Sequence, residues 1–107
     1  MAGIIDFRRG TTFDAAYELT VVISDLPVPD LTGFSGAAKL KPENAAPINL
    51  TFAWINPALR LAAITAGPTA DWPLGGAWVE VQLTSPSGVI IDVEPVTLRI
   101  MKGFADD

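Results

Sequence analysis

The sequence predicts an all-β domain, a sandwich or barrel of about seven strands. Nine prolines and nine glycines interrupt the chain every few residues. The intervals between them are short and rich in Val, Ile, Leu, Thr and aromatic residues, which is typical of strands. No segment keeps helical periodicity over the ~11 residues that a helix assignment needs. At 107 residues, we expect one domain, 1–107, with a core of modest size.

The first half of the chain contains four predicted strands. A short strand covers 4–7, and a long one covers 14–24, where alternation places five residues on one face: Ala15, Tyr17, Leu19, Val21 and Ile23. We expect a loop at 25–33, because two prolines there remove backbone donors. Strands at 34–41 and 48–54 follow, and their inward residues are Phe34, Gly36, Ala38 and Leu40, then Ile48, Leu50, Phe52 and Trp54.

The next predicted strand covers 58–66, with one face formed by Leu59, Leu61, Ala63 and Thr65. Thr69 has the character of a helix N-cap and Asp71 lies in the first turn, but Pro73 and the glycines at 75–76 stop a helix at once. We therefore expect one short helical turn near 69–74.

The strand predicted at 77–84 places Ala77, Val79, Val81 and Leu83 inward and Trp78, Glu80, Gln82 and Thr84 outward. The sequence Ser-Pro-Ser-Gly at 85–88 suits a type I turn.

The last strand contains a change of phase. Val89, Ile91 and Val93 share one parity, while Val96, Leu98 and Ile100 share the other. A shift of one residue moves every side chain to the opposite face of a sheet. We therefore predict a β-bulge, or a strand that changes sheets, at 94–95.

Several kinds of chemistry lack the residues they need. The chain has no cysteine and no histidine, which excludes thiol catalysis, disulfides, Cys/His zinc sites and imidazole bases. Absent cysteines fit a chain that folds in a reducing cytoplasm. No apolar run approaches the ~18–20 residues of a membrane span, and the first residues do not resemble a signal peptide. We expect no cofactor and no membrane association.

The charge and hydropathy of the chain indicate what kind of partner to expect. A net charge of −5 with a pI near 4.4 disfavours nucleic acid. The mean hydropathy of +0.37 is high for a small soluble domain, and burial of apolar surface against a protein partner explains it best.

The order of motifs is distinctive. Arg-Arg-Gly-Thr-Thr-Phe-Asp at 8–14 follows the first strand, and Pro-Asp-Leu-Thr-Gly-Phe at 29–34 leads into another. The turn at 69–74 and the two glycines precede the strand that begins near Trp78, and Ser-Gly at 87–88 closes the next hairpin. Over roughly its whole length, the chain resembles small tailed-phage virion proteins and the N-terminal domain of phage baseplate upper proteins. The resemblance implies an immunoglobulin-like antiparallel β-sandwich that serves as an architectural part of a virion, and it supplies no catalytic residues.

The acidic residues offer two candidate sites, each with a simpler interpretation. Glu80 and Asp92 are a possible glycosidase pair, because both project from one hairpin. As outward residues on alternating strands they are more simply solvated. Asp25 and Asp30 are possible calcium ligands, but they lack the spacing of an EF-hand loop. Turn capping explains them better.

The tryptophans and the one basic pair are the candidate contact residues. Trp54 shares the parity of a core face, and Trp72 is placed to plug one end of the sandwich or to meet a partner. Trp78 projects outward beside Glu80, so a protein interface is favoured over a sugar-stacking site. Arg8 and Arg9 are either a docking contact for an acidic neighbour or a solvated edge.

Together these observations predict a non-enzymatic structural component of a phage virion, made in the host cytoplasm and associated with the tail or baseplate. It would act by packing against copies of itself or another virion protein. A capsid decoration protein and a carbohydrate-binding module for host surface glycans are the alternatives.

Overall fold

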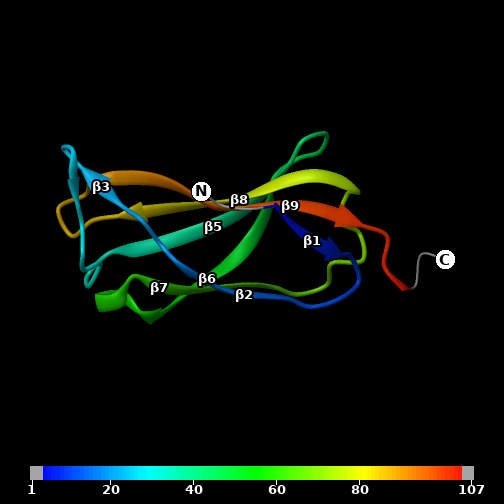
Figure 1. The fold of residues 1–107 in the computed structure, drawn as a ribbon, viewed down its shortest axis with the longest axis horizontal. Coiled ribbons are helices and arrows are strands. Elements are labelled where there is room, and N and C mark those ends of the chain that lie inside the picture. Colours follow the sequence, from blue (N-terminus) through cyan, green and yellow to red (C-terminus); the bar gives the residue numbers. More distant parts are fainter. Residues whose placement is uncertain (1–3, 105–107) are drawn as a thin grey trace.

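The fold is all-β, as the sequence predicts. The computed structural model describes residues 4–104, which form an elongated body measuring 48 × 22 × 22 Å (Figure 1). The long strands are β1 (Ile4–Arg8), β2 (Phe13–Glu18), β5 (Ser35–Pro42), β6 (Ile48–Asn56), β7 (Leu61–Ala66), β8 (Gly75–Thr84) and β9 (Ile90–Met101). Two short strands, β3 (Val22–Ile23) and β4 (Leu26–Pro27), form a hairpin, and η1 (Pro57–Leu59) is a 3₁₀ helix. No helix within this described part is long and apolar enough to cross a membrane.

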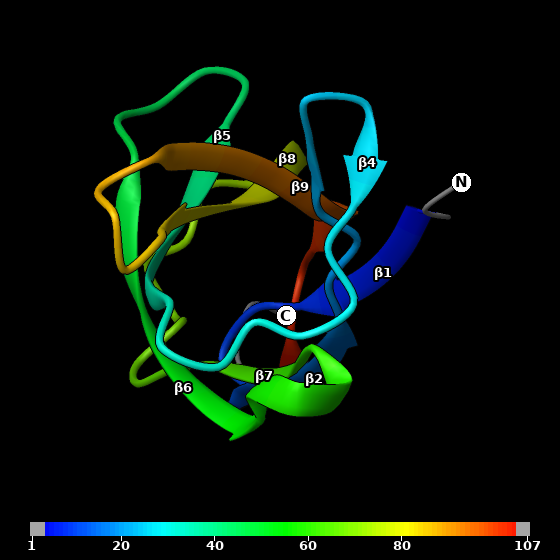
Figure 2. The same ribbon diagram turned by 90° about the vertical axis from the view of Figure 1, so that its left-hand side faces the viewer.

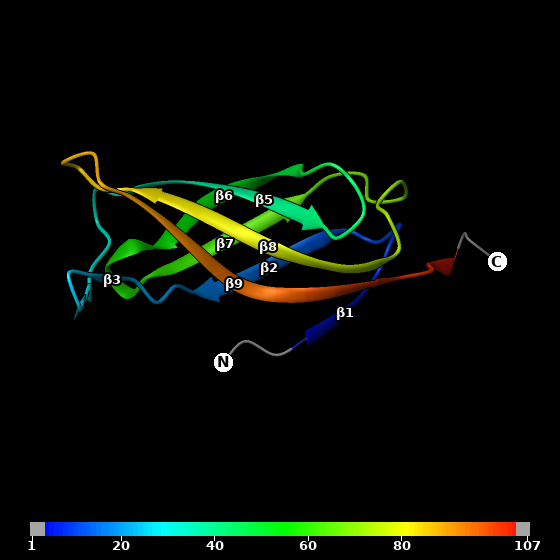
Figure 3. The same ribbon diagram turned by 90° about the horizontal axis from the view of Figure 1, so that it is seen from above.

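The seven long strands form one curled sheet that folds into two layers. Their order is β1-β9-β8-β5-β6-β7-β2, and Figure 2 shows how the sheet wraps around an interior. Strand β6 belongs to both layers, because 48–50 pair with β5 and 51–56 pair with β7. The remaining strands group as β2-β7 opposite β1-β9-β8-β5, the arrangement of an immunoglobulin-like sandwich. Seen from above in Figure 3, the strands of both layers run along the long axis.

One pairing differs from the predicted antiparallel arrangement. β1 runs parallel to β9, with Ile4 opposite Thr97 and Arg8 opposite Met101. The short connection at 9–12 carries the chain directly from β1 in one layer to β2 in the other, so β1 takes the last strand as its neighbour. Local alternation cannot reveal this, because it does not depend on which strand lies alongside.

The long strand predicted at 14–24 is interrupted. β2 ends at Glu18, and the loop predicted at 25–33 contains β4, which pairs with β3 around a two-residue turn. Ser24 and Asp25 form that turn with φ of 52° and 66°, the left-handed conformation that a tight hairpin needs. The predicted inward face is nevertheless confirmed, since Leu19 and Val21 are buried.

The strand predicted at 58–66 begins later than expected, because 57–59 form the 3₁₀ helix η1 and Arg60 ends it in the left-handed conformation with φ of 60°. Leu61, Ala63 and Thr65 share one face of β7, as predicted, and the opposite face is the inner one, since Ala62 and Ile64 are fully buried. Leu59, which is 57% exposed, belongs to η1 and not to the alternation of β7.

The turn predicted at 69–74 is present as one hydrogen-bonded turn, in which the Trp72 N–H donates to the Thr69 carbonyl at 3.0 Å. Thr69 does not cap a helix. Its buried hydroxyl accepts from the Gly10 N–H at 2.8 Å and donates to the Thr11 carbonyl at 2.6 Å. Thr69 therefore ties the β7–β8 connection to the β1–β2 connection.

The predicted β-bulge is confirmed. Val79 lies opposite Val96 and Val81 lies opposite Val93, so two residues of β9 occupy the place of one residue of β8. The extra residue corrects the phase of β9. Inward-facing residues therefore continue on both sides of the bulge, and the buried ones beyond it are Val96, Leu98 and Ile100.

Aromatic residues pack at both ends of the interior. At one end the Trp72 ring lies 5.1 Å from the Phe7 ring and 5.6 Å from the Phe13 ring, measured between centroids. At the other end Trp54 packs edge-on against Phe52, and its indole N–H donates to the Phe34 carbonyl at 2.9 Å. The inward position predicted for Trp54 is confirmed, since it packs against the buried core.

Gly36 leaves the space that the Phe52 ring occupies. A Cβ at position 36 would come within 2.5–2.8 Å of three Phe52 ring atoms. We expect Gly36→Ala to lower the free energy of unfolding by about 1–3 kcal/mol, because the ring must move in a packed core. Urea denaturation measures this. Gly67→Ala is the control, since a Cβ there meets no atom within 4 Å, and equal losses in both variants would contradict the explanation.

The Thr69 hydroxyl gives a second stability prediction. Thr69→Val keeps the shape of the side chain but removes both hydrogen bonds to the β1–β2 connection, and we expect it to cost about 1–3 kcal/mol. Thr69→Ser keeps the hydroxyl and should retain more stability in the same thermal or urea unfolding experiment. A serine variant that is less stable than the valine variant would show that the methyl group, not the hydroxyl, matters.

Candidate interaction surface

The outer face of β8 carries the candidate contact residue Trp78. It lies in a row of residues that are in register across four strands, with Thr97 of β9 on one side and Lys41 of β5 on the other. Ile4 of β1 continues the row beyond Thr97. These four residues, here called the Trp78 row, project away from the core, because their neighbours Ala77 and Leu98 point inward and are buried.

Two ion pairs adjoin Trp78 and its row, and one of them includes the row residue Lys41. On one side Arg99 donates to both carboxylate oxygens of Asp6, from Nε at 2.9 Å and from its terminal nitrogen at 3.0 Å. On the other side Lys41 Nζ lies 2.7 Å from Glu80 Oε1. The hydrogen bond from Arg99 holds the pKa of Asp6 below its ordinary value, and Asp6 in turn raises the pKa of Arg99. The charges around the row are therefore already paired within the chain.

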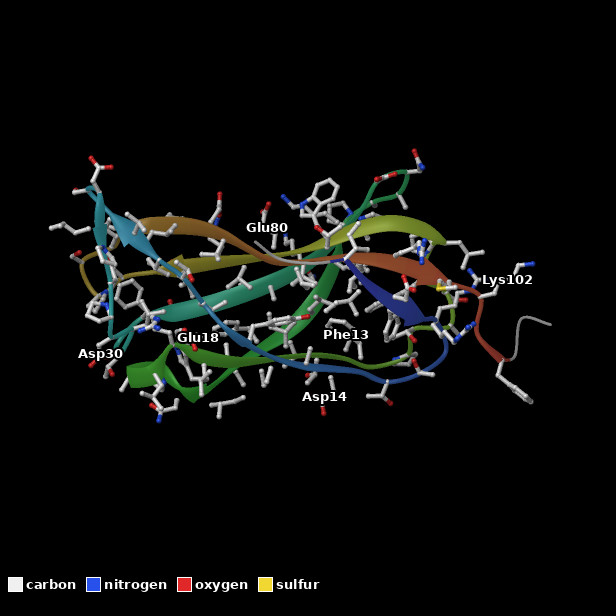
Figure 4. The ribbon with its side chains drawn as sticks, viewed as in Figure 1. Phe13, Asp14, Glu18, Asp30, Glu80 and Lys102 are labelled. Atoms are coloured by element: carbon white, nitrogen blue, oxygen red, sulfur yellow. The ribbon has the colours of Figure 1, made fainter. Side chains whose placement is uncertain are left out.

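A hollow lies on the same face. Its volume is about 240 Å³, and it is lined by Ala37, Lys39, Lys41, Glu80 and Gln82. The small Ala37 side chain sits opposite Gln82 on the neighbouring strand, which leaves room between longer side chains. Figure 4 shows Glu80 directed outward from its layer, whereas Phe13 lies between the layers.

This arrangement is suited to binding another surface. Trp78 is half-buried and Ile4, at the β1 end of the row, is 71% exposed, so the row combines apolar side chains with polar neighbours, a composition found in protein interfaces. Each of these charges keeps its partner when the surface is covered, so the additional cost of burying an unpaired charge does not arise.

The basic pair lies apart from the Trp78 row. Arg8 is exposed at the far end of β1 and donates to the Lys102 carbonyl at 3.0 Å. Arg9 donates to the Trp72 carbonyl at 3.0 Å, so it supports the connection between β7 and β8. Arg8 lies four residue steps beyond Ile4, which is ~13 Å along a strand, and the structure does not bring the pair beside Trp78.

Trp72 is not available as a contact residue, contrary to its inclusion among the candidate interface residues. Only 3% of it is exposed, because it packs against Phe7 and Phe13. The alternative interpretation, a plug at one end of the sandwich, is confirmed. Sequence could not decide between the two, since residues 69–74 have no strand parity to indicate a direction.

Three of the four candidate acidic residues, Glu80, Asp92 and Asp30, have local partners. Asp92 accepts from the Gln82 side-chain amide at 3.3 Å, and Glu80 is paired with Lys41. Asp30 accepts from the Thr32 hydroxyl at 2.6 Å and from the Thr32 N–H at 2.8 Å; these bonds lower the pKa of Asp30. Within residues 4–104, no group of three or more acidic side chains is placed to hold a metal ion.

Sequence reasoning identified Trp78 but missed Ile4, Asp6 and Arg99. Strand alternation alone showed that Trp78 points outward. The other three enter the surface only through the parallel pairing of β1 with β9, which no local pattern encodes. The sequence signal for the ion pair was an Asp on the first strand and an Arg on the last, and these two residues are 93 positions apart.

Comparison with known proteins does not identify a family for this chain. No protein-family model matches the chain, and no curated protein matches it.

The Asp6–Arg99 pair gives a prediction on pH dependence. The folded-state pKa of Asp6 lies below its ordinary value of 3.8, so its contribution to stability is present above that value and is lost as the pH falls through the lower folded-state pKa. We therefore expect acidification to destabilise the wild-type chain more than Asp6→Asn. Unfolding curves at a series of pH values measure this.

A carboxyl-detected NMR titration provides the matching control. The Asp6 pKa should move back toward its ordinary value in Arg99→Gln, because the charged donor is removed. An Asp6 pKa that is the same in both proteins would contradict the assigned cause.

Proposed function

We propose that this chain is a structural component of a phage virion, associated with the tail or baseplate, that works by packing against copies of itself or a neighbouring virion protein. The observation that carries the proposal is the Trp78 row, which presents an exposed isoleucine and a tryptophan between two satisfied ion pairs. Tryptophan and arginine dominate the residues that contribute most to protein interfaces.

The distribution of apolar residues supports the same proposal. Ile90 and Phe104 are 63% and 97% exposed, and Ile4 of the Trp78 row is 71% exposed, so part of the high mean hydropathy comes from apolar side chains at the surface. Covering them with a partner would remove that apolar area from water. The order of motifs resembles that of phage virion proteins, and this resemblance supports a phage virion as the assembly.

The hollow beside Trp78 favours one alternative. Its polar lining of lysine, glutamate and glutamine side chains next to an aromatic ring is a combination suited to a sugar. A carbohydrate-binding module for host surface glycans is therefore the second candidate. A capsid decoration protein remains the alternative within the structural class.

Truncation of Trp78 tests the proposal. We expect Trp78→Ala to weaken self-association, or capture of a virion protein, by about 30-fold or more, because a central interface tryptophan typically contributes at least ~2 kcal/mol. Light scattering across a concentration series and pull-down from virion proteins measure this. Leu26→Ala, on the β3–β4 hairpin away from the row, is the control.

Three outcomes separate the candidates. Assembly that depends on Trp78 and not on Leu26 supports the proposal. Binding on a glycan array that is lost in Trp78→Ala, with no protein assembly, favours the carbohydrate-binding alternative. A strict monomer that captures neither a virion protein nor a glycan would contradict both.

A further inference from the structure

The two ends of the curled sheet are unpaired strand edges. β1 is the first strand in the order and β2 the last, and Figures 2 and 3 place them on the same side of the molecule. Within residues 4–104, neither strand has a second neighbour in the sheet. Free edges of this kind pair readily with another strand.

The hydrogen bonds at each strand end show which backbone groups point away from the sheet, and of these the Arg8 carbonyl already accepts from the Thr11 hydroxyl at 2.6 Å. The Arg9 N–H donates to the Met101 carbonyl. The backbone N–H and C=O groups of the odd residues of β1 therefore point toward β9, and those of even residues such as Asp6 point away from the sheet at its free edge. The Leu19 N–H donates to the Arg60 carbonyl, so the backbone groups of the odd residues of β2 point toward β7. Ala16 and its even neighbours therefore direct their backbone groups to the free edge of β2.

We propose that a second copy of this chain closes both edges at once, with β1 of each copy pairing antiparallel to β2 of the other in a two-fold dimer. This proposal rests on the proposed function and names the partner. Five successive antiparallel pairings separate β9 from β2, so β2 runs opposite to β1. A two-fold axis along the strands preserves strand direction, and β1 then meets the other copy's β2 in the antiparallel sense.

Charge selects the register. Pairing Asp6 with Ala16 of the other copy places Arg8 opposite Asp14. Moving the register by two residues in either direction places Asp6 opposite Glu18 or Asp14, and like charges directly opposite one another are destabilising. The selected register joins opposite charges and avoids carboxylates that face each other. Arg8 and Asp14 are both exposed, and Figure 4 shows Asp14 pointing away from the interior.

The inner face supports the same register. Ile5 shares its direction with its partner Leu98, which is 1% exposed, yet Ile5 itself is 47% exposed. An inward-facing isoleucine is left open because no strand lies beyond β1. In the selected register Ile5 lies opposite Tyr17 of the other copy, a pairing of β-branched and aromatic residues that stabilises antiparallel strands. The dimer would thus cover the gap in each core.

A charge exchange tests the proposal in the full chain. We expect Asp14→Arg alone and Arg8→Glu alone each to weaken dimerisation about tenfold or more, since the two-fold repeats each contact. The double variant Arg8→Glu/Asp14→Arg should return the dissociation constant to near the wild-type value. Sedimentation equilibrium measures all four proteins, and circular dichroism checks that each remains folded.

A second pair of variants tests the register without touching these charges. Ala16→Asp places a carboxylate opposite Asp6 and should weaken the dimer, whereas Ala16→Lys should not. Self-association that is insensitive to all of these changes but sensitive to Trp78→Ala overturns the edge dimer and leaves the proposed function standing. A monomer that captures a virion protein through Trp78 would likewise overturn the edge dimer and leave the proposed function standing. Assemblies larger than a dimer would overturn the two-fold arrangement.

Discussion

The packing of Trp72 against Phe7 and Phe13 is the contact on which the rest of this structure depends. It joins β1, β2 and the β7–β8 connection at one point. The buried hydroxyl of Thr69 fixes the backbone around the same point. Because the connection between β1 and β2 is short, fixing this end determines that β1 lies beside β9 in one layer while β2 lies beside β7 in the other.

The position of β1 in turn determines the outer surface. Its parallel register with β9 brings Asp6 to Arg99 and places Ile4 in line with Thr97 and Trp78. A shift of one residue would direct Asp6 inward and Phe7 outward, which would remove both the ion pair and the aromatic plug. The core contact and the surface pair therefore select the same register from opposite faces of the strand.

Much of the fold could be predicted from alternation alone, and the exceptions share one cause. The strands from β5 to β9 were found, and the bulge in β9 followed from a change of parity that an uninterrupted strand cannot accommodate. The predicted element bounds failed near Ser24, Asp25 and Arg60, where non-glycine residues adopt left-handed backbone conformations. Such residues reverse the chain or end an element without the glycine that normally signals a turn, so the sequence pattern marks neither the β3–β4 hairpin nor the start of β7.

The surface was predictable only where it depended on one strand. Trp78 needed nothing beyond the parity of β8, whereas Trp72 lies in a connection where no period applies. Ile4, Asp6 and Arg99 needed the pairing of the two chain-distant edge strands. Sequence therefore identified the most prominent residue of the surface but not its surroundings, because the surroundings are assembled by strand order and register.

The outward residues of the two free edge strands, β1 and β2, differ in their charge, although the fold does not require this difference. β2 carries Asp14 and Glu18 on its outer side, and these would face each other if two copies of β2 paired antiparallel. Such like-charge contacts are one means by which proteins prevent unwanted edge pairing. β1 has no such pattern, since its outward residues are apolar, acidic and basic in turn, and Ile4 and Ile5 remain exposed. Pairing of β2 with a second β2 is thus disfavoured by like charges, whereas pairing of β2 with β1 is not. This difference in charge makes the edges of β1 and β2 complementary.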